Sequence, residues 1–398
     1  MEYSICCGEK ISRLGFGMMR LPVHPMSGEI NQDELNKMVD RALDAGVNYF
    51  DTAFPFHGGK SEIAAGRALG RHPRSSFFLA TKYPGHQYAE NYCPAEIFEE
   101  QLEKCGVDYF DFYLLHNVCE TCINVYEDPK WGILDYFLKQ KKAGRIRHLG
   151  FSSHAELPTL NRFLNFSNDT MEFCQIQLNW LDWTLQKARE KYDLLSSRGI
   201  PIWVMEPLRG GRLAHLGESS EKKLKSIRPQ ESVASWSFRW LMRLQNVKII
   251  LSGMSDMKQM EDNLRTFGSA SGLSDNEADL LREIADELHA MIPCTGCGYC
   301  IPTCPAGLHI PELLASLNDA LFSTSSITVG MKMESLTEAQ LPSACLGCGI
   351  CMRICPQGIK IPEYMKKFAQ LLGKLPSWKK ICAERAAAAK KLKEKVER

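Results

Sequence analysis

Cys294-Thr-Gly-Cys-Gly-Tyr-Cys-Ile-Pro-Thr-Cys-Pro305 is repeated further along the chain as Cys345-Leu-Gly-Cys-Gly-Ile-Cys-Met-Arg-Ile-Cys-Pro356. Both copies follow the pattern C-x2-C-x2-C-x3-C-P, and together they use eight of the sixteen cysteines. The short spacers, each containing glycine, let three cysteines of a run turn toward one centre. This pattern therefore determines how the last part of the chain folds.

The spacing of these cysteines is typical of two [4Fe–4S] clusters held as in bacterial ferredoxins. The first three cysteines of a run bind one cluster, and the fourth, turned away by the proline, binds the other. We therefore expect one cluster on Cys294, Cys297, Cys300 and Cys355, and the other on Cys345, Cys348, Cys351 and Cys304. Two zinc sites are the alternative that C-x2-C spacing also permits, but two complete runs ending in proline favour the clusters.

The cysteine runs, the first residues and the net charge indicate which class of protein this is. Thiolate ligands must stay reduced before cluster assembly, and the first residues carry no secretion signal, so we expect a cytoplasmic redox protein. No apolar run is long enough for a membrane span. The net charge of +1 gives no case for a nucleic-acid partner. The expected partners are a small-molecule substrate and an electron-donor protein such as a ferredoxin or flavodoxin.

Before the cysteine runs, short apolar segments alternate with amphipathic segments of helical period, such as 32–44 and 97–104. Repeated strand–helix units indicate a parallel sheet, and about eight of them over roughly 285 residues suit a (β/α)8 TIM barrel. A doubly wound sheet is disfavoured because no G-x-G-x-x-G follows an early strand. The expected strands are 47–50, 77–80, 109–115, 146–151, 173–178, 200–205 and 247–251.

These patterns divide the chain into three expected parts. They are a barrel over residues 1–285, a ferredoxin-like two-cluster domain over 286–375 and a basic C-terminal helix over 376–398. Within the second part, 310–322 is expected to be a helix. Residues 322–343 have a Ser/Thr-rich start and few apolar anchors, so we interpret them as an inserted loop.

Polar residues stand at the ends of three successive expected strands. They are Asp51, Lys82 and His116. Catalytic groups of TIM barrels lie at the C-terminal ends of strands. A partly buried lysine paired with an aspartate can hold a polarised proton donor and stabilise a developing oxyanion. Each residue alone has a structural explanation, as a cap, a rim lysine or a core histidine, but the three together favour an active site.

The segment Asn48-Tyr-Phe-Asp-Thr-Ala-Phe-Pro-Phe-His-Gly-Gly-Lys-Ser-Glu62 resembles the signature of the aldo-keto reductases. Other segments fit that family in the same order, and the resemblance spans about residues 10–290. With the cysteine runs appended, the chain is similar to an iron–sulfur subgroup of the family. The other matching segments are Thr81-Lys82, Leu114-Leu-His116, Gly150-Phe-Ser-Ser-His154, Gln175, Met205-Glu-Pro-Leu-Arg-Gly-Gly211, Ser252-Gly-Met-Ser255 and Asn263.

The resemblance implies a catalytic tetrad of aspartate, tyrosine, lysine and histidine. Asp51, Lys82 and His116 match three of these positions, but the tyrosine position holds Phe56. In the family the phenol protonates the carbonyl oxygen as hydride arrives at carbon. General acid catalysis contributes about 10²–10⁴ in rate. We therefore expect weakened carbonyl reduction unless His116, Lys82 or a water supplies the proton, or a different reaction.

The resemblance also implies a nicotinamide cofactor, NADH or NADPH. Ser152, Ser153 and Gln175 match the positions that hold its carboxamide, and Met205 the position that stacks on the ring. Gln259 stands where an arginine often grips the 2′-phosphate, which weakens a preference for NADPH. The other implied contacts are Leu208, Gly210 and Gly211 on the pyrophosphate, and Ser255, Gln259 and Asn263 on the adenosine end.

Several loop residues have open interpretations. Tyr83, His86, Tyr88, Trp131 and Trp180 are candidates for a substrate pocket. The pair in Cys119-Glu-Thr-Cys122 is either a redox pair, part of a metal site with Cys93, or ordinary packing.

Two functions remain. In one, the barrel is an oxidoreductase of aldo-keto reductase type that reduces a carbonyl-related substrate with electrons from NAD(P)H, the clusters, or both. In the other, the barrel is a docking module and the clusters relay electrons between proteins. Retention of Asp51, Lys82 and His116 favours the enzyme.

Overall fold

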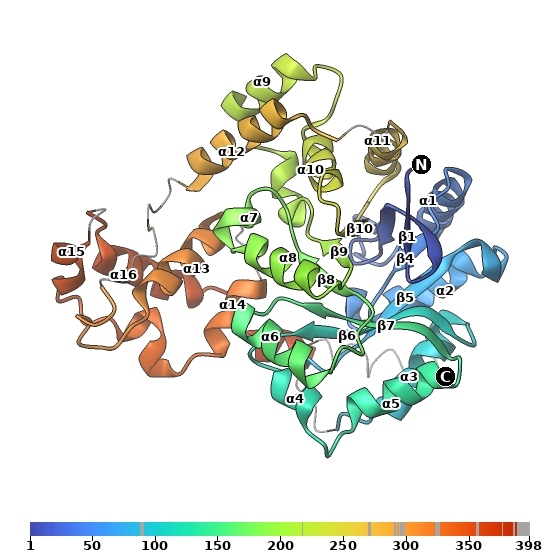
Figure 1. Ribbon diagram of the computed structural model, residues 1–398, viewed down its shortest axis with the longest axis horizontal. Helices are drawn as coiled ribbons and strands as arrows, with labels where there is room; N and C mark the ends of the chain where they lie inside the picture. Colours follow the sequence, from blue (N-terminus) through green and yellow to red (C-terminus); the bar gives the residue numbers. More distant parts are fainter. Residues whose placement is uncertain are drawn as a thin grey trace. The chain divides into compact units, whose positions relative to one another are not determined.

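A computed structural model describes most of the chain (Figure 1). The described residues are 1–87, 91–216, 218–269, 272–289, 292, 294, 298, 300–322, 327–355, 358–375, 377–384 and 387. They form two compact units. The first contains 1–179 and 188–274 with the described residues after 381, and the second contains 180–187 and 275–381.

The first unit is a closed barrel of eight parallel strands, which confirms the expected fold. The strand order around the barrel is β10-β3-β4-β5-β6-β7-β8-β9, so each strand pairs with its neighbours in sequence and the last pairs with the first. The strands are β3 (Leu14–Gly17), β4 (Tyr49–Asp51), β5 (Phe78–Tyr83), β6 (Phe110–Val118), β7 (Ile146–Ser153), β8 (Cys174–Gln177), β9 (Ile202–Met205) and β10 (Val247–Ser252).

Helices lie outside this barrel (Figure 1). Helix α1 (Gln32–Asp44) begins after Asn31, whose side chain accepts a hydrogen bond from the Glu34 amide, and it buries Leu35, Met38, Val39 and Ala42 on one face. The other helices of this unit are α2 (Ser61–Leu69), α3 (Pro94–Cys105), α4 (Ile123–Glu127), α5 (Ile133–Lys142), α6 (Leu157–Phe166), α8 (Ala188–Ser197), α9 (Glu218–Ile227), α10 (Val233–Met242) and α11 (Met257–Gly268), with 3₁₀ turns η1 (Phe56–Gly59), η2 (Arg74–Ser76) and η3 (Arg209–Ala214).

A hairpin closes the N-terminal end of the barrel. Strands β1 (Tyr3–Cys6) and β2 (Glu9–Ser12) pair antiparallel, and the buried side chains of Cys6 and Ile11 pack with those inside the barrel. The interior side chains in this cluster include Tyr49, Phe112 and Trp203. The hairpin, which the sequence analysis did not predict, leaves the C-terminal ends of the strands as the place for chemistry.

The second unit has its own core of apolar side chains and cysteines. The segment expected to be an inserted loop instead contains a helix, α14, which buries Val329, Met331 and Met333. The elements of this unit are α7 (Asp182–Leu185), α12 (Asp275–His289), α13 (Ile310–Phe322), α14 (Ile327–Glu334), α15 (Ile350–Ile354) and α16 (Ile361–Leu372), with 3₁₀ turns η4 (Glu338–Gln340) and η5 (Pro342–Ala344).

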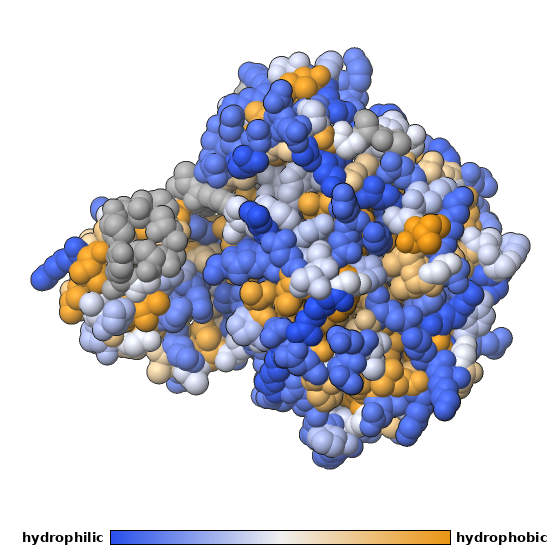
Figure 2. Space-filling view, in the orientation of Figure 1, coloured by the Kyte–Doolittle hydropathy of each residue, from blue (hydrophilic) through white to orange (hydrophobic). Residues whose placement is uncertain are grey.

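Two surface properties bear on partners. Leu346, Ile350 and Met352 beside the second cysteine run are exposed, and Figure 2 shows apolar surface near α15. None of the helices that the structure describes combines the length and apolar character needed to cross a membrane. Of the expected tail helix, 378–384 are helical, and most of the rest lies outside the described residues.

Candidate functional site

The candidate catalytic residues continue the inward-facing rows of the barrel strands. Side chains alternate along a strand, so residues two apart share a face. Tyr49 and Ala80 belong to the interior core, and Asp51 and Lys82 follow them by two positions. His116 stands in the same relation to the interior residue Leu114. The three polar residues therefore lie at the C-terminal end of the interior, as the sequence analysis expected.

Lys82 and Asp51 form a buried ion pair. The Lys82 ammonium donates to the Asp51 carboxylate and, at 2.7 Å, to the Thr52 carbonyl oxygen. Both residues are almost fully buried, with 0% and 2% of their surface exposed. Burial lowers the pKa of Lys82 and raises the pKa of Asp51, while the attraction between their charges opposes both shifts. A cation is thus held at the inner end of the site.

The ring of Phe56 contacts both the Lys82 ammonium and the His116 imidazole. The Lys82 ammonium nitrogen is 5.5 Å from the centre of the Phe56 ring. The imidazole of His116 approaches the same ring edge-on, with the ring centres 5.8 Å apart. His86 packs against His116 from another side, with ring centres 4.3 Å apart. The site therefore joins one buried ammonium, one phenyl ring and two imidazoles.

A buried network behind Lys82 was not foreseen in the sequence. The carboxylate of Glu62 accepts hydrogen bonds from the Thr81 hydroxyl at 2.6 Å and the Gln101 amide at 2.7 Å. Gln101 also donates to the Lys82 carbonyl oxygen at 3.0 Å and accepts from the Tyr113 hydroxyl. These bonds fix the backbone that carries Lys82. Glu62 stands in the segment that resembles the family signature, which was the available signal.

Ser152 and Gln175, which are expected to contact a carboxamide, are paired on the adjacent strands β7 and β8. The Gln175 side-chain oxygen is buried and has no hydrogen-bond partner in the described part of the chain. Ser152 accepts a hydrogen bond from the Asn117 amide at 2.8 Å, so its own hydroxyl proton can be donated elsewhere. Both fit a ligand amide, which offers a donor to Gln175 and an acceptor to Ser152.

The Ser153 hydroxyl forms hydrogen bonds with the backbone of the protein. Its hydroxyl donates to the Val118 carbonyl oxygen at 2.8 Å and accepts from the Ala155 amide at 3.0 Å. This side chain stabilises the turn after β7, so its part in holding a cofactor is the weakest of the three.

The expected pyrophosphate contacts lie after β9. Gly210 and Gly211 have φ values of 67° and 94°, which glycine adopts without strain, and both are exposed. Met205 and Leu208 are half-buried on the same segment. The loop thus presents backbone with little side-chain cover, as close approach to a phosphate requires.

The expected adenosine contacts lie between β10 and α11. Asp256 caps α11, accepting from the Gln259 amide at 2.8 Å, and the Gln259 side chain turns back to accept from the Ser255 amide at 3.0 Å. Asn263 donates to the Ser252 hydroxyl at 2.9 Å. Gln259 and Asn263 therefore have structural roles in joining the helix to the strand, whatever else they contact.

The residues expected to line the substrate pocket do not all lie in the candidate site. His86 lies in the site, but Tyr83 is fully buried, packs against Phe137 with ring centres 5.2 Å apart and donates to the Tyr92 carbonyl oxygen at 2.7 Å. The prediction for Tyr83 was wrong, because Lys82 points inward and the next residue on the strand must point outward.

The assignment of the other three candidates to a substrate pocket stays a prediction. Trp131 packs against Tyr92, with ring centres 5.3 Å apart, and Trp180 begins the segment that belongs to the second unit. Tyr88 is outside the described residues.

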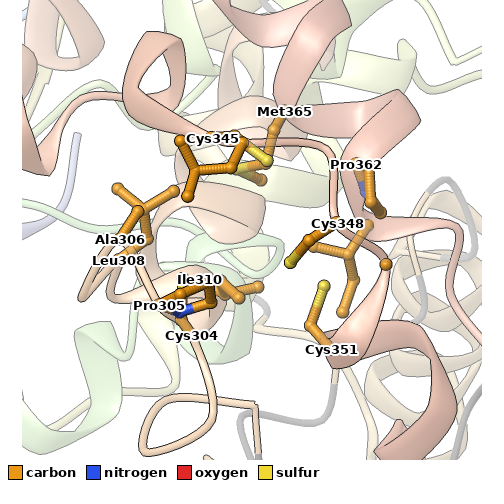
Figure 3. Close-up of a pocket in the computed structure, with 13 residues that line it drawn as sticks. Cys304, Pro305, Ala306, Leu308, Ile310, Cys345, Cys348, Cys351, Pro362 and Met365 are labelled. Atoms are coloured by element: carbon orange, nitrogen blue, oxygen red, sulfur yellow. The ribbon is translucent and has the colours of Figure 1, made fainter.

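In the second unit, four cysteines line one apolar pocket (Figure 3). They are Cys304, Cys345, Cys348 and Cys351, the set expected to share a cluster. Gly347 and Gly349 have φ values of 67° and 73°, which lets the loop turn between the cysteines. Burial and the neighbouring thiols raise the pKa of Cys351. Crowded thiols of this kind fit a cationic iron centre, which stabilises the thiolate form.

The other expected set is described only in part. Cys294, Cys300 and Cys355 all pack on the core of the second unit, and Cys297 lies outside the described residues. Their assignment to one cluster stays a prediction from the spacing.

Comparisons with known proteins agree with both units. The model of the aldo/keto reductase family matches residues 13–286, and that of a 4Fe-4S dicluster domain matches residues 293–360. The chain is 24% identical over 322 residues to an NADH-specific methylglyoxal reductase of Escherichia coli (strain K12), covering 70% of this chain and 96% of that protein. It is 24% identical over 307 residues to an L-galactose dehydrogenase of Arabidopsis thaliana, covering 69% and 89%.

Solved structures show the same fold. An aldo-keto reductase from Bacillus halodurans in its holo form superposes with a TM-score of 0.58 at 23% identity, covering 71% of this chain and 96% of that chain. A thermostable aldo-keto reductase in complex with the inhibitor epalrestat also gives 0.58, at 22% identity, covering 71% and 100%. The chain belongs to the aldo/keto reductase family and carries a 4Fe-4S dicluster domain after its barrel.

Proposed function

We propose that the chain is an oxidoreductase that reduces a carbonyl-related organic substrate at the C-terminal end of the barrel. The observation that carries this is the meeting of the buried Lys82–Asp51 pair with Phe56 and His116. A buried ammonium beside an aromatic ring and an imidazole is suited to a substrate oxygen that gains negative charge.

In this proposal Phe56 occupies the place of the family's tyrosine and changes how the proton is supplied. A phenyl ring has no proton to give, so the substrate oxygen must be protonated by another group. His116 is the proposed donor because its ring borders the Phe56 ring, and His86 packs beside it. Lys82 stabilises the developing oxyanion, and Asp51 compensates the charge of Lys82 while the site is empty.

Electrons reach this site from a bound nicotinamide, from the clusters, or from both. A nicotinamide would supply hydride, and Gln175 and Ser152 are the proposed residues that orient its carboxamide. The clusters would supply single electrons, and the two sets of four cysteines are the proposed ligands. A ferredoxin or flavodoxin is the proposed donor to the clusters.

Titration of the intact protein with NADH and NADPH is expected to show saturable binding of at least one. Gln175→Leu removes the buried acceptor and Ser152→Ala removes the hydroxyl, so each is expected to weaken binding by roughly tenfold, the effect of one hydrogen bond of about 1.4 kcal/mol. Ser226→Ala, which removes an exposed serine hydroxyl at the end of α9, serves as the control and should leave binding unchanged. Failure of both cofactors to bind would leave the clusters as the electron source.

Anaerobically prepared protein is expected to contain about eight iron and eight sulfide per chain, as two cubic clusters require. Cys348→Ala is expected to reduce the iron content to about half, because one cluster loses a ligand. Cys382→Ser changes a buried cysteine outside the runs and should retain the full content. Zinc in place of iron in the unaltered protein would refute the assignment.

The second candidate function is an electron relay in which the barrel only docks a partner. The exposed Leu346, Ile350 and Met352 beside the second cysteine run favour it, because an apolar surface next to a redox centre suits a protein partner. Cluster reduction that proceeds with no turnover of any carbonyl substrate, whatever the donor, would support the relay over the enzyme.

A further inference from the structure

Two cysteines occupy the loop that follows the catalytic histidine. Cys119 comes directly after β6, and Cys122 caps α4, so both lie within six residues of His116. Their sulfur atoms are 3.4 Å apart, and both side chains are buried, with 4% and 3% of their surface exposed. The oxidoreductase mechanism proposed above makes no use of them.

The environments of the two thiols differ. Cys119 interacts with the Thr121 hydroxyl at 3.2 Å, and the hydrogen bond with Cys122 lowers the pKa of Cys119 against the opposing effect of burial. Burial raises the pKa of Cys122, and its thiol donates to the Asn117 carbonyl oxygen at 3.1 Å. The Cys122 proton is thus directed to the Asn117 carbonyl oxygen, while the Cys119 sulfur has the Thr121 hydroxyl and the Cys122 thiol as neighbours, which is the asymmetry of a reactive dithiol.

This pair is coupled to the active site through Asn117, the residue after His116. Asn117 has a φ of 56°, a left-handed conformation that asparagine adopts more readily than most residues with a side chain, and the surrounding hydrogen bonds help to hold it. Two of these bonds come from the Cys122 thiol to its carbonyl oxygen and from its amide to the Ser152 hydroxyl. Loss of the Cys122 proton removes one of them.

The geometry points to a reversible dithiol–disulfide couple at Cys119 and Cys122 that alters the strand end carrying His116. Low-molecular-weight disulfides are the oxidant class. The Cys119 thiolate attacks the oxidant, forms a mixed disulfide and releases one thiolate. Cys122 then loses its proton and attacks the Cys119 sulfur, which releases the second thiolate. Two cysteine thiols are oxidised to one disulfide, and the oxidant is reduced to two thiols that take up the two protons.

A metal site is the competing explanation for two close cysteines. In the described part of the chain, the groups of three or more potential ligands within 4.8 Å comprise Cys7, His148 and Glu172 alone. Cys7 lies in the turn of the N-terminal hairpin, His148 near the start of β7 and Glu172 just before β8, so this group is at the opposite end of the barrel. Cys93 therefore does not join Cys119 and Cys122 in such a group, and a dithiol with no third ligand among the residues that the structure describes favours redox chemistry.

The test equilibrates the full-length cluster-loaded protein, without oxygen, in glutathione buffers of rising oxidised fraction. Samples are quenched with acid, alkylated with N-ethylmaleimide, digested and measured by mass spectrometry. The peptide containing Cys119 and Cys122 is expected to lose both alkyl groups and two hydrogen atoms together, and to regain its thiols when dithiothreitol is added. The lone buried Cys174 is the internal reference and should stay alkylated throughout.

Variants and a second measurement separate a redox couple from simple packing. Cys119→Ser and Cys122→Ser should each abolish the disulfide, while Cys93→Ser should preserve it. Amide hydrogen exchange at Asn117 should become faster on oxidation of the unaltered protein only, because the Cys122 donor is lost. Iron content is measured in each sample to show that the clusters persist. A peptide that stays fully alkylated in wholly oxidised glutathione, or one shielded by bound zinc, would overturn the inference.

Discussion

Phe56→Tyr is expected to raise the rate of NAD(P)H-dependent carbonyl reduction by about 10² or more. The ring already lies between Lys82 and His116, at 5.5 Å from the ammonium nitrogen and 5.8 Å from the imidazole centre. The substitution adds one oxygen to this ring, and the buried ammonium stabilises the phenolate that remains after proton transfer. The measurement compares kcat/KM of both proteins on one carbonyl substrate.

A matched control isolates the position of the new hydroxyl. Phe54→Tyr adds the same oxygen to a half-buried ring that faces Lys104, whose ammonium lies 4.1 Å from the ring centre. This variant should leave the rate unchanged. A one-electron donor in place of NAD(P)H gives a second comparison, because cluster-driven chemistry gains nothing from a phenol. An unaltered protein that already reduces carbonyls at full reductase rates would contradict the role given to Phe56.

Removing one partner of the Lys82–Asp51 pair is expected to lower the free energy of unfolding of the barrel by about 3–5 kcal/mol. Lys82→Met leaves the Asp51 carboxylate buried without its cation. The double variant Asp51→Leu/Lys82→Met removes both charges and should cost clearly less than the single change. Urea unfolding followed by tryptophan fluorescence measures this, since Trp203 lies in the barrel core.

The stability loss of the Lys82→Met protein is expected to depend on pH in a definite direction. Burial raises the pKa of Asp51, and loss of Lys82 removes the attraction that opposes this rise. The folded Lys82→Met protein therefore binds a proton more tightly than the unfolded chain. The loss of unfolding free energy in Lys82→Met should be small below the pKa of the Asp51 carboxyl in the unfolded chain. This loss should grow as pH rises from there toward the pKa of the same carboxyl in the folded protein.

An exposed pair supplies the control for the charge-removal experiment. Arg41 and Glu261 form a two-point ion pair at 2.6 and 3.0 Å with about two-fifths of each side chain exposed. Arg41→Met should cost only about 0–1 kcal/mol, because water screens this pair. A loss for Lys82→Met no larger than that for Arg41→Met would show that Asp51 is neutralised or solvated at little cost.

The barrel was predictable because its signal is repeated. Seven of its strands contain apolar runs followed by polar ends, and those runs lie at or near the expected positions. The first strand, β3, was missed because Leu14–Gly17 is short and contains two glycines. The structure explains one of them, since a side chain at Gly15 would come within 2.6 Å of Leu251. Close packing inside the barrel requires a residue that sequence reading associates with turns.

The site was predictable only as a set of positions. The ends of the expected strands identify Asp51, Lys82 and His116. The direction in which each side chain points depends on the exact register of the strand, and Tyr83 was wrongly assigned to the pocket because that register was not known. The cap formed by Asp256 and Gln259 has a readable D-x-x-Q spacing, and it was overlooked because Gln259 was interpreted through the cofactor. The network of Glu62 and Gln101 joins residues 39 apart, and no local pattern reports such a contact.

The membership of residues 180–187 in the second unit has a consequence for the order of synthesis. Within that unit, Gln186 donates to the Asp319 carboxylate at 3.0 Å, and the two residues are 133 positions apart. A ribosome that has just translated β8 has yet to make the residues on which this segment packs. Completion of the barrel's eight strands thus precedes formation of the Gln186–Asp319 hydrogen bond, so this segment reaches its final contacts only after the C-terminal domain has been synthesised.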